Sequence, residues 1–362
     1  LFLRCLLFIY SSQTCNVRWG SVYSHVFTVR NGVRQGAISS PILFCIYINK
    51  LISKLRYSSL GCQLQGVYLG IWVYADDIIL LSPSRSALQS MTTICENYAQ
   101  STKLKFSTNP VPEKSKTKCL IFTKENINMN DILPIMLNGL PLPFVNEVKH
   151  LGNILQTDNS MNNDMNIKRA KFISKIHSLN QEFYFTDPYI VMKLYSIYAC
   201  SFHGSSLWNL YSDNAMRLYS SWNVAVRILF DVPRDTHRYF IEPISRHYHI
   251  KTLLCSRFIS FCDSLFRSSK LSIRLLSNLC KHDYRTVLCK NLKNISRDCN
   301  CNINNLSKHF VKTNLRFHEV PQEYAWKVPI LLELLQTRTD DIIIDGFARE
   351  DISDYIDFLC SD

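Results

Sequence analysis

The chain has 362 residues, enough for two or three domains with cores of their own, and it is 47% hydrophobic, 12% aromatic and 19% charged. With 10 glycines, no low-complexity tract and no internal repeat, it is not a collagen-like, repeat or intrinsically disordered protein. Its net charge of +12 is uneven, because the first 75 residues hold seven basic side chains and no acidic one. Segment 340–362 holds eight acids and one base, so the rest of the chain is near +19. Such a basic body favours a polyanionic partner such as nucleic acid, and a charge serving only solubility is the alternative.

Fourteen cysteines are scattered along the chain, often inside apolar segments such as those around Cys5, Cys45, Cys95 and Cys200. This pattern is typical of reduced, buried thiols, so we expect a nuclear or cytoplasmic protein in a reducing compartment. Residues 1–10 are apolar, but a basic residue interrupts them and no small-residue cleavage site follows. We therefore expect a buried helix there and no signal peptide. No stretch is long and apolar enough to span a membrane, and no membrane contact is expected.

The first half of the chain predicts a mixed α/β region. Pro41 stands where proline is favoured, in the first turn of a helix, and Ser84 is a good helix cap. In chain order, we expect a helix end at 1–12, a strand pair in 15–30, a helix at 42–55, a loop or strand edge at 61–70, a hairpin at 71–81, a helix from 84 to about 103, a strand at 118–123, and short strands in 135–140 and 145–155.

After about residue 159 the strand signals fade and helical periodicity takes over. The expected helices cover 167–180, 188–210, 213–229 and 253–279, and the Asn- and Ser-rich stretch 291–307 predicts a loop. The acidic segment at 340–362 is expected to be a flexible or peripheral appendage. The sequence therefore predicts a mixed α/β domain followed by an all-helical region.

The first acidic residues of the chain are the adjacent pair Asp76 and Asp77, between the apolar runs 71–73 and 78–81. Two neighbouring carboxylates in an apolar setting repel each other and resist burial unless a positive charge compensates them. A divalent cation is the obvious compensator, because hard carboxylate oxygens suit Mg²⁺. The pair alone is weak evidence, since such pairs also occur in solvated turns and at helix N-termini.

Motifs on both sides of this pair make the interpretation specific. They are Asn-Gly-Val-Arg-Gln-Gly-Ala-Ile-Ser-Ser-Pro-Ile-Leu-Phe at 31–44, Tyr-Ala-Asp-Asp at 74–77, Lys-Thr at 116–117 and Val-Lys-His-Leu-Gly at 148–152. In this order and spacing the sequence resembles the reverse transcriptases of non-LTR (LINE-type) retrotransposons, over roughly residues 1–230. The resemblance implies an α+β fold, with a partial right-hand polymerase palm (an antiparallel sheet with helices) at 1–157. A helical thumb at 158–235, a helical C-terminal region at 236–339 and an acidic tail at 340–362 would follow.

The resemblance also implies RNA-directed DNA polymerase activity, with an RNA template, a DNA primer, deoxynucleoside triphosphates and two Mg²⁺ ions as partners. One metal activates the primer 3′-hydroxyl and the other holds the triphosphate. Asp76 would be the essential metal ligand and Asp77 a supporting one. Lys116 would neutralise or protonate the departing pyrophosphate, with Lys114 and Lys118 as competitors and a simply basic loop as the alternative.

Other positions would hold the nucleic acid. Gln35 and Gly36 would lie under the templating base pair, where a Cβ at 36 would intrude. Arg34 is a candidate phosphate contact, with a solvated loop arginine as the alternative. The turn Leu151–Gly152 resembles a primer grip, although His150 stands where an aromatic residue is more usual. Four basic residues of one helix would follow the duplex backbone, with a solvent-facing helix as the bland alternative: Lys168, Arg169, Lys171 and Lys175.

Two further motifs carry no catalytic interpretation. The segment 203–208, His-Gly-Ser-Ser-Leu-Trp, resembles a stretch that follows the thumb in this family and predicts packing. The Cys and His residues at 280–301 fit no standard zinc spacing.

A polymerase of this kind needs a third carboxylate upstream, and no acidic residue precedes Asp76. We therefore expect a C-terminal fragment without the fingers and the first catalytic strand, inactive by itself. The alternatives are a non-catalytic nucleic-acid-binding remnant and a group II intron maturase-like protein. A nucleotide cyclase is disfavoured because it explains neither the Gln-Gly loop nor the primer-grip match.

Overall fold

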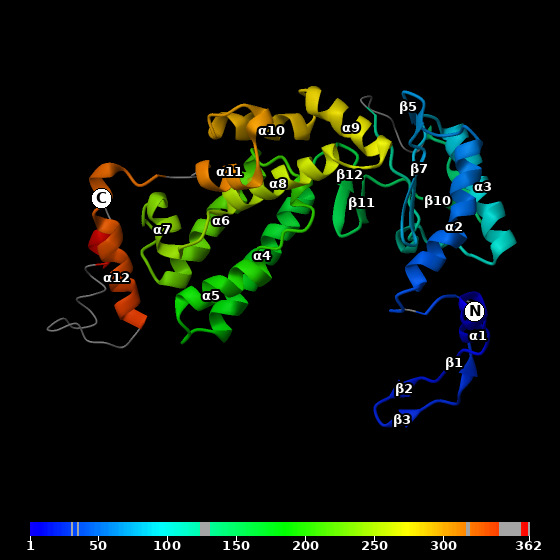
Figure 1. Cartoon of the computed structure of the whole chain (residues 1–362), viewed down its shortest axis with the longest axis horizontal. Helices are drawn as coiled ribbons and strands as arrows, with labels where there is room; N and C mark the ends of the chain where they lie inside the picture. The colour runs from blue at the N-terminus through cyan, green and yellow to red at the C-terminus, as the bar shows by residue number, and fades with distance from the viewer. Residues whose placement is uncertain (30–31, 35, 124–130, 316–318, 340–355, 361–362) are drawn as a thin grey trace. The chain divides into compact units, whose positions relative to one another are not determined.

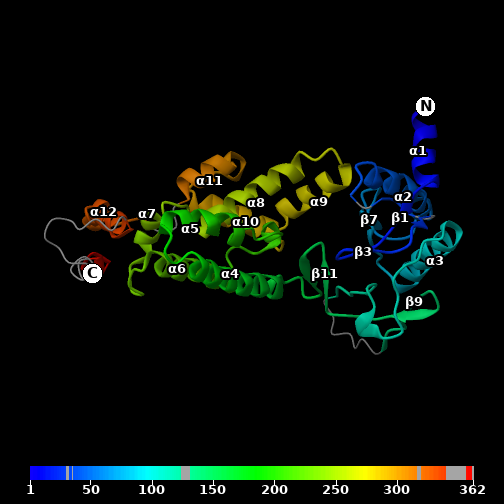
Figure 2. The ribbon, with the colours of Figure 1, turned by 90° about the horizontal axis from the view of Figure 1, so that it is seen from below.

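The computed structural model describes the chain except residues 30–31, 35, 124–130, 316–318, 340–355 and 361–362 (Figures 1 and 2). The chain forms two compact units, one of Leu1–Cys119 with Asn128–Phe144 and one of Leu120–Ile127 with Val145–Asp362. The first unit combines helices with small antiparallel sheets, and the second is largely helical. This is the α+β class that the sequence predicts. The predicted boundaries between palm, thumb, C-terminal region and acidic tail, at 157, 235 and 339, stay predictions.

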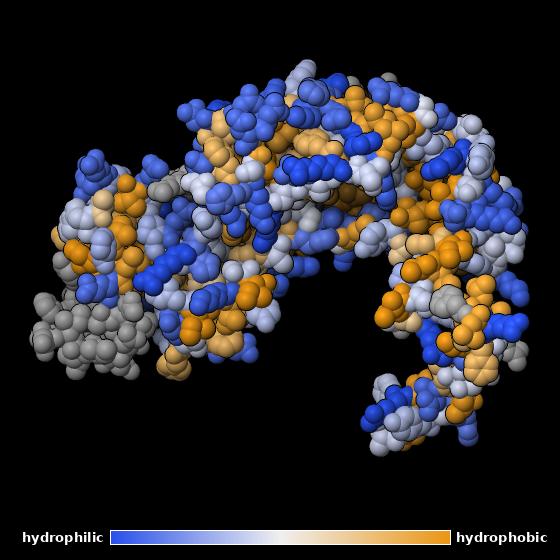
Figure 3. Space-filling view, in the orientation of Figure 1, coloured by the Kyte–Doolittle hydropathy of each residue, from blue (hydrophilic) through white to orange (hydrophobic). Residues whose placement is uncertain are grey.

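The first unit begins with an exposed apolar segment. Helix α1 (Phe2–Ser11) leads into a ribbon of two-residue strands that pair antiparallel. They are β1 (Thr14–Cys15), β2 (Arg18–Trp19), β3 (Val22–Tyr23) and β4 (Phe27–Thr28). The helix forms as expected, but the expectation that it is buried is wrong, because Leu7 and Phe8 are 69% and 72% exposed. Figure 3 shows orange, hydrophobic surface over this part of the chain.

The core of the first unit lies between two helices and a hairpin (Figure 1). Helix α2 (Ser40–Tyr57) has Pro41 in its first turn, and α3 (Arg85–Thr102) starts where the Ser84 side chain accepts a hydrogen bond from the Ala87 amide. Both agree with the sequence prediction. Leu51, Leu55 and Met91 are completely buried there. Strands β7 (Ile71–Tyr74) and β8 (Asp77–Leu80) pack their apolar side chains on this cluster.

Two smaller hairpins complete the first unit. Strands β5 (Gln63–Leu64) and β6 (Val67–Tyr68) form one, and β9 (Ile135–Leu137) and β10 (Leu140–Leu142) form the other beside α3, as Figure 2 shows for β9. The short 3₁₀ helix η1 (Pro112–Lys114) precedes Lys116. The strand expected at 118–123 does not form. The structure describes all six residues, and of these only Cys119 forms a β-bridge, to Phe144.

The second unit starts with the hairpin of β11 (Glu147–His150) and β12 (Asn153–Gln156), followed by helix α4 (Asn162–Glu182). The further helices are α5 (Pro188–Leu194), the π-helix η3 (Tyr195–Ala199), η4 (Ser205–Leu207), α6 (Asp213–Phe230), η5 (Arg238–Phe240), α7 (Ile241–Ser245), α8 (Ile250–Phe266), α9 (Leu271–His282), α10 (Val287–Asp298), η6 (Ile303–Asn305), α11 (Lys308–Asn314), η7 (Gln322–Tyr324) and α12 (Lys327–Thr339). None of the helices in the described part of the chain has the length and apolarity needed to cross a membrane.

Four sequence predictions for this unit need correction. The helix expected at 188–210 ends at 199, and the one expected at 253–279 is broken after Phe266. The loop expected at 291–307 is instead helical through Asp298, because α10 buries Cys289, Leu292 and Ile295 along one face. Of the acidic segment, residues 340–355 and 361–362 lie outside the described chain, and the described part does not form a peripheral appendage, since Leu359 and Cys360 are buried in the core.

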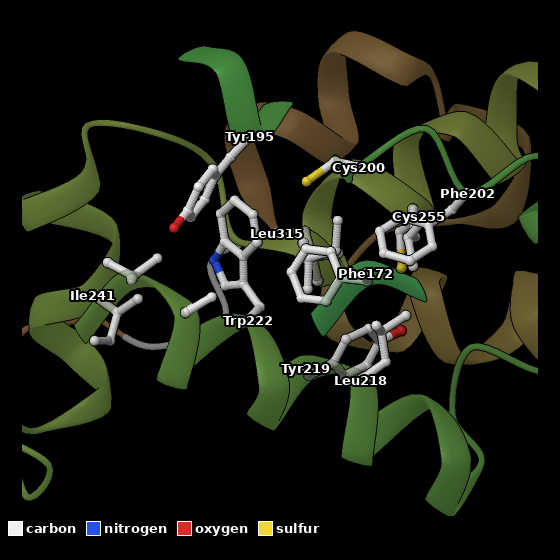
Figure 4. Packing of buried hydrophobic residues seen from close by; sticks show 14 of the residues in the cluster. Phe172, Tyr195, Cys200, Phe202, Leu218, Tyr219, Trp222, Ile241, Cys255 and Leu315 are labelled. Atoms are coloured by element: carbon white, nitrogen blue, oxygen red, sulfur yellow. The ribbon is translucent and has the colours of Figure 1, made fainter. Parts of the chain in front are cut away.

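One large core holds the second unit together. Trp222 on α6 stacks near Phe172 on α4, at a ring-centroid distance of 6.3 Å, and Figure 4 shows both among Tyr195, Leu218 and Tyr219. This cluster draws residues from 165 to 360, so the segments expected as thumb and C-terminal region share one core. Each buried aromatic side chain of this size removes a large apolar area from water.

Candidate functional site

The aspartate pair stands at the tip of the β7–β8 hairpin. Tyr74 pairs with Asp77 in the antiparallel register, so Ala75 and Asp76 form a two-residue turn. Ala75 has a φ of +50°, a left-handed conformation that costs a non-glycine residue roughly 1–2 kcal/mol. Both carboxylates are exposed, while the strands behind them pack on the core of the first unit. The fold thus holds two anions in solvent on a tightly anchored support.

These carboxylates suit a hard divalent cation. Mg²⁺ keeps several waters and is often held by one or two carboxylates together with substrate phosphates. Among the residues that the structure describes, no three His, Cys, Asp or Glu side chains gather closely enough to hold a metal ion. Asp76 and Asp77 therefore fit as part of a magnesium site that needs ligands from elsewhere.

The loop before α2 is fixed by its own hydrogen bonds. The Ser40 hydroxyl donates to the Arg34 carbonyl at 2.5 Å, and hydrogen bonds from Ser40 and Ser39 lower the pKa of Tyr10. Gly36 has a φ of +82°, which favours glycine, and a Cβ built there would meet nothing within 4 Å. Arg34 is exposed, and Gln35 lies outside the described residues. Open space over Gly36 is compatible with a close ligand.

Lys116 is presented by an anchored loop. The Ser115 hydroxyl donates to the Thr117 carbonyl, and the Thr117 hydroxyl donates to the Ser107 carbonyl, both at 2.8 Å. Lys116 between them is exposed, as is Lys114, whereas Lys118 is half-buried. The two exposed lysines are the better candidates for contact with a bound phosphate.

The predicted primer-grip turn belongs to the second unit and closes the β11–β12 hairpin. His150 pairs with Asn153, which leaves Leu151 and Gly152 as the turn, at φ values of +46° and +80°. Positive φ at both positions is the mark of the type I′ turn that fits the twist of a hairpin. The ring of His203 reaches this turn, with Nε2 at 3.1 Å from the Leu151 carbonyl oxygen.

The four basic residues of α4 divide into different environments. The Lys168 ammonium donates to Asp164 Oδ2 at 2.9 Å and to Asn153 Oδ1 at 2.7 Å, and its side chain is 15% exposed. Lys168 is therefore an internal residue, and a contact with a nucleic-acid backbone does not fit its bonding. Arg169 is half-buried, and Lys171 and Lys175 are exposed. Lys175 also donates to the Tyr198 carbonyl at 2.7 Å.

Sequence reasoning missed the centre of this arrangement, Asp164. This carboxylate is 2% exposed and accepts from Trp208 Nε1 at 2.8 Å and from the Ile154 amide at 3.2 Å, as well as from Lys168. Its i,i+4 spacing to Lys168 is a visible signal of an ion pair. Nothing in the sequence alone links it to the 203–208 segment.

One comparison with known proteins bears on this site. Residues 5–153 match the family model described as reverse transcriptase (RNA-dependent DNA polymerase). The match covers the Arg34–Gly36 loop, the Tyr74–Asp77 hairpin, Lys116 and the Leu151–Gly152 turn. Residues 5–153 are therefore similar to reverse transcriptase domains, and proteins of that family use nucleic-acid templates and deoxynucleoside triphosphates.

Proposed function

We propose that the chain is the palm and thumb portion of an RNA-directed DNA polymerase of the non-LTR (LINE-type) retrotransposon class. The observation that carries this proposal is the tight β7–β8 hairpin, which exposes Asp76 and Asp77 at its tip within the matched segment. The order of the surrounding motifs, from the Arg34–Gly36 loop to Leu151–Gly152, favours the LINE-type class.

In this proposal the residues of the first unit serve phosphoryl transfer. Asp76 and Asp77 would hold the two Mg²⁺ ions, which supply the charge that activates the primer hydroxyl and steadies the triphosphate. Lys116 would meet the departing pyrophosphate. Gln35 and Gly36 would lie under the templating base pair, and Arg34 would contact a phosphate. In the second unit, Leu151–Gly152 would press on the primer, and Lys171 and Lys175 would contact the duplex backbone.

Cleavage of the chain by a bound metal ion tests whether the metal site lies at the β7–β8 tip. With Fe²⁺ in place of Mg²⁺ and an RNA–DNA primer–template present, locally generated hydroxyl radicals are expected to cut the chain near the β7–β8 tip. The cut is expected to vanish in Asp76→Asn. Glu96→Gln, which removes one acid from α3 in the same unit, is the matched control and keeps the cut. An uncut tip in the wild-type chain contradicts the metal role of the pair.

Catalysis by the chain alone is tested by primer extension on poly(rA)/oligo(dT) with Mg²⁺. We expect no incorporation, because no acidic residue precedes Asp76 to complete the ligand set. Robust incorporation that is lost in Asp76→Ala would overturn this expectation and leave the polymerase assignment stronger.

A binding measurement distinguishes the proposed polymerase function from that of a protein that does not bind nucleic acid. We expect salt-dependent binding of an RNA–DNA duplex, measured by fluorescence anisotropy. Lys171→Gln is expected to weaken binding uniformly and to reduce the salt slope by about 1, since one phosphate contact is lost. Lys281→Gln on α9 is a charge-matched control. An unchanged slope in Lys171→Gln excludes Lys171 from the interface.

A further inference from the structure

The turn of the β11–β12 hairpin is held by a segment about fifty residues further along the chain. A carbonyl oxygen only accepts, so the 3.1 Å contact between His203 Nε2 and the Leu151 oxygen requires the proton on Nε2. The same ring flanks Gly152, where an added Cβ would lie 3.4 Å from His203 Cδ2. His203 is therefore hydrogen-bonded to Leu151 and lies next to Gly152.

Gly204 brings the backbone of this segment against the hairpin. Its φ is +77°, and a Cβ built there would lie 1.8 Å from Asn153 Oδ1, which is far too close for two non-bonded atoms. Only glycine allows this approach without displacing Asn153, the first residue of β12. The contact is thus fixed by the shape of the chain as well as by hydrogen bonds.

The Asp164–Lys168 ion pair, which is largely buried, connects the β11–β12 hairpin to the segment 203–208. Asp164 binds the hairpin through the Ile154 amide and the segment through Trp208 Nε1. Lys168 binds the hairpin through Asn153 Oδ1 and the segment through the His203 carbonyl, at 2.7 and 2.5 Å. The three N–H donors of the ammonium match its three acceptors. Since both charged groups are bonded on several sides, the pair fixes hairpin, helix and segment in one geometry.

Packing alone does not require all of these bonds. Trp208 is fully buried and belongs to the core, but His203 and Leu151 are exposed. A hydrogen bond between two exposed groups adds little stability, because water satisfies each of them equally well. What the His203 bond does provide is a fixed orientation of the turn backbone at the surface.

We propose that His203 is a positioning residue for the primer strand. It would act with Gly204 and the Asp164–Lys168 pair, and hold the Leu151–Gly152 turn in the orientation that meets the primer's sugar-phosphate backbone. This inference rests on the proposed function, since the primer contact of that turn is part of it. It gives a role to a segment that sequence reasoning assigned to packing.

The first experiment compares His203→Leu with His203→Gln, because the glutamine amide can donate to the Leu151 carbonyl and leucine cannot. A primer with a photoreactive base near its 3′ end is annealed to an RNA template and crosslinked to the full chain. We expect the crosslink at 151–152 to fall roughly tenfold in His203→Leu and to be largely kept in His203→Gln, consistent with the loss of one oriented hydrogen bond.

Hydrogen exchange follows the hairpin itself in the same variants without nucleic acid. The amides of 150–154 are expected to exchange several-fold faster in His203→Leu, while those of the β9–β10 hairpin keep the wild-type rate and serve as the internal control. If His203→Leu leaves both the exchange and the crosslink unchanged, the positioning role is wrong.

The second experiment uses the close approach at Gly204. Gly204→Ala is expected to reduce the crosslink, because its Cβ would collide with the Asn153 amide. Asn153→Ala in the same protein removes the colliding group and is expected to restore part of the loss, so the two substitutions are non-additive. Purely additive effects contradict the inference.

The outcomes separate the two proposals. A wild-type chain that binds the primer–template and crosslinks at 151–152, with equal behaviour of His203→Leu, overturns the positioning role alone. A wild-type chain that does not bind the primer–template overturns the proposed function, and the primer role of His203 falls with it.

Discussion

The β7–β8 and β11–β12 hairpins have the same plan and opposite surroundings. Each pairs two four-residue strands across a two-residue turn that begins with a non-glycine residue at positive φ. The first turn carries carboxylates into solvent, and the second is held by His203 and by the Asp164–Lys168 pair. A site that takes up a cation gains from exposed, hard oxygen ligands, whereas a surface that presents backbone to a partner gains from external support.

The largest predicted effect comes from removing the support of the second hairpin. Asp164→Ala leaves the Lys168 ammonium, 15% exposed, without its anion in a largely buried site and is expected to lower the free energy of unfolding by about 3–5 kcal/mol. Urea unfolding followed by the fluorescence of the buried Trp208 and Trp222 measures it. Adding Lys168→Met removes the orphaned charge and is expected to recover part of the loss. If Asp164→Ala unfolds at the wild-type midpoint, the ion pair does not secure the hairpin.

Alkali is predicted to weaken the second unit through its buried thiols. Burial raises the pKa of Cys255 and of Cys262 to about 12. In the unfolded chain a thiol ionises near pH 8.5, so the unfolded state loses its proton first and is favoured as pH rises. The stabilisation is complete below about pH 8.5 and is lost towards pH 12, at up to about 1.4 kcal/mol per pH unit for each thiol.

The slope of stability against pH tests this directly. Urea midpoints between pH 8 and 10.5 are expected to fall less steeply in Cys255→Ala than in the wild type, whatever the stability of that variant at pH 8. Cys45→Ala, which removes an exposed thiol from the first unit, should keep the wild-type slope. Equal slopes in all three proteins would show that these thiols do not control the alkaline loss.

The smallest predicted effect concerns the exposed tip of the first hairpin. Ala75→Gly relieves the left-handed strain at φ +50° and is expected to raise the free energy of unfolding by up to about 1 kcal/mol, less the entropy that glycine gains in the unfolded chain. The same change at Ala87, in the first turn of α3, is expected to destabilise the protein by up to about 1 kcal/mol. Urea unfolding compares the two variants. Destabilisation by both would show that the turn at Ala75 is not strained.

Local features of the fold were predictable because neighbouring residues determine them. The Ser84 cap, the proline at the start of α2 and the apolar runs on both sides of the turn in 71–81 each act within a few residues, and each prediction is confirmed. Helix α10 was missed because its asparagines are typical of loops. Asn291 is completely buried, with its side chain bonded to the Leu210 amide and the Trp208 carbonyl. A polar residue with such distant partners cannot be distinguished from a loop residue by composition.

The candidate site also contains residues whose place depends on neighbouring residues and residues whose place depends on distant ones. Asp76, Asp77 and the Leu151–Gly152 turn could be located from sequence, since a short motif specifies each hairpin. The environment of Lys168 could not, because its acceptors come from three separate segments, including the His203 carbonyl 35 residues away. Spacing on a helix places a lysine on a face, but only the packed structure determines whether that face meets solvent or another part of the chain.

The π-helix η3 follows α5 and contains one residue more than a regular α-helical turn. The Cys200 amide donates to the Tyr195 carbonyl at 3.1 Å, a span of five residues, and the extra residue leaves the Tyr198 carbonyl turned towards Lys175. Deleting the exposed Ile197 would restore an ordinary helical ladder but withdraw the acceptor that tethers this lysine. The deletion of one residue would thus free the Lys175 ammonium from its hydrogen bond and increase the range of positions that its side chain can adopt.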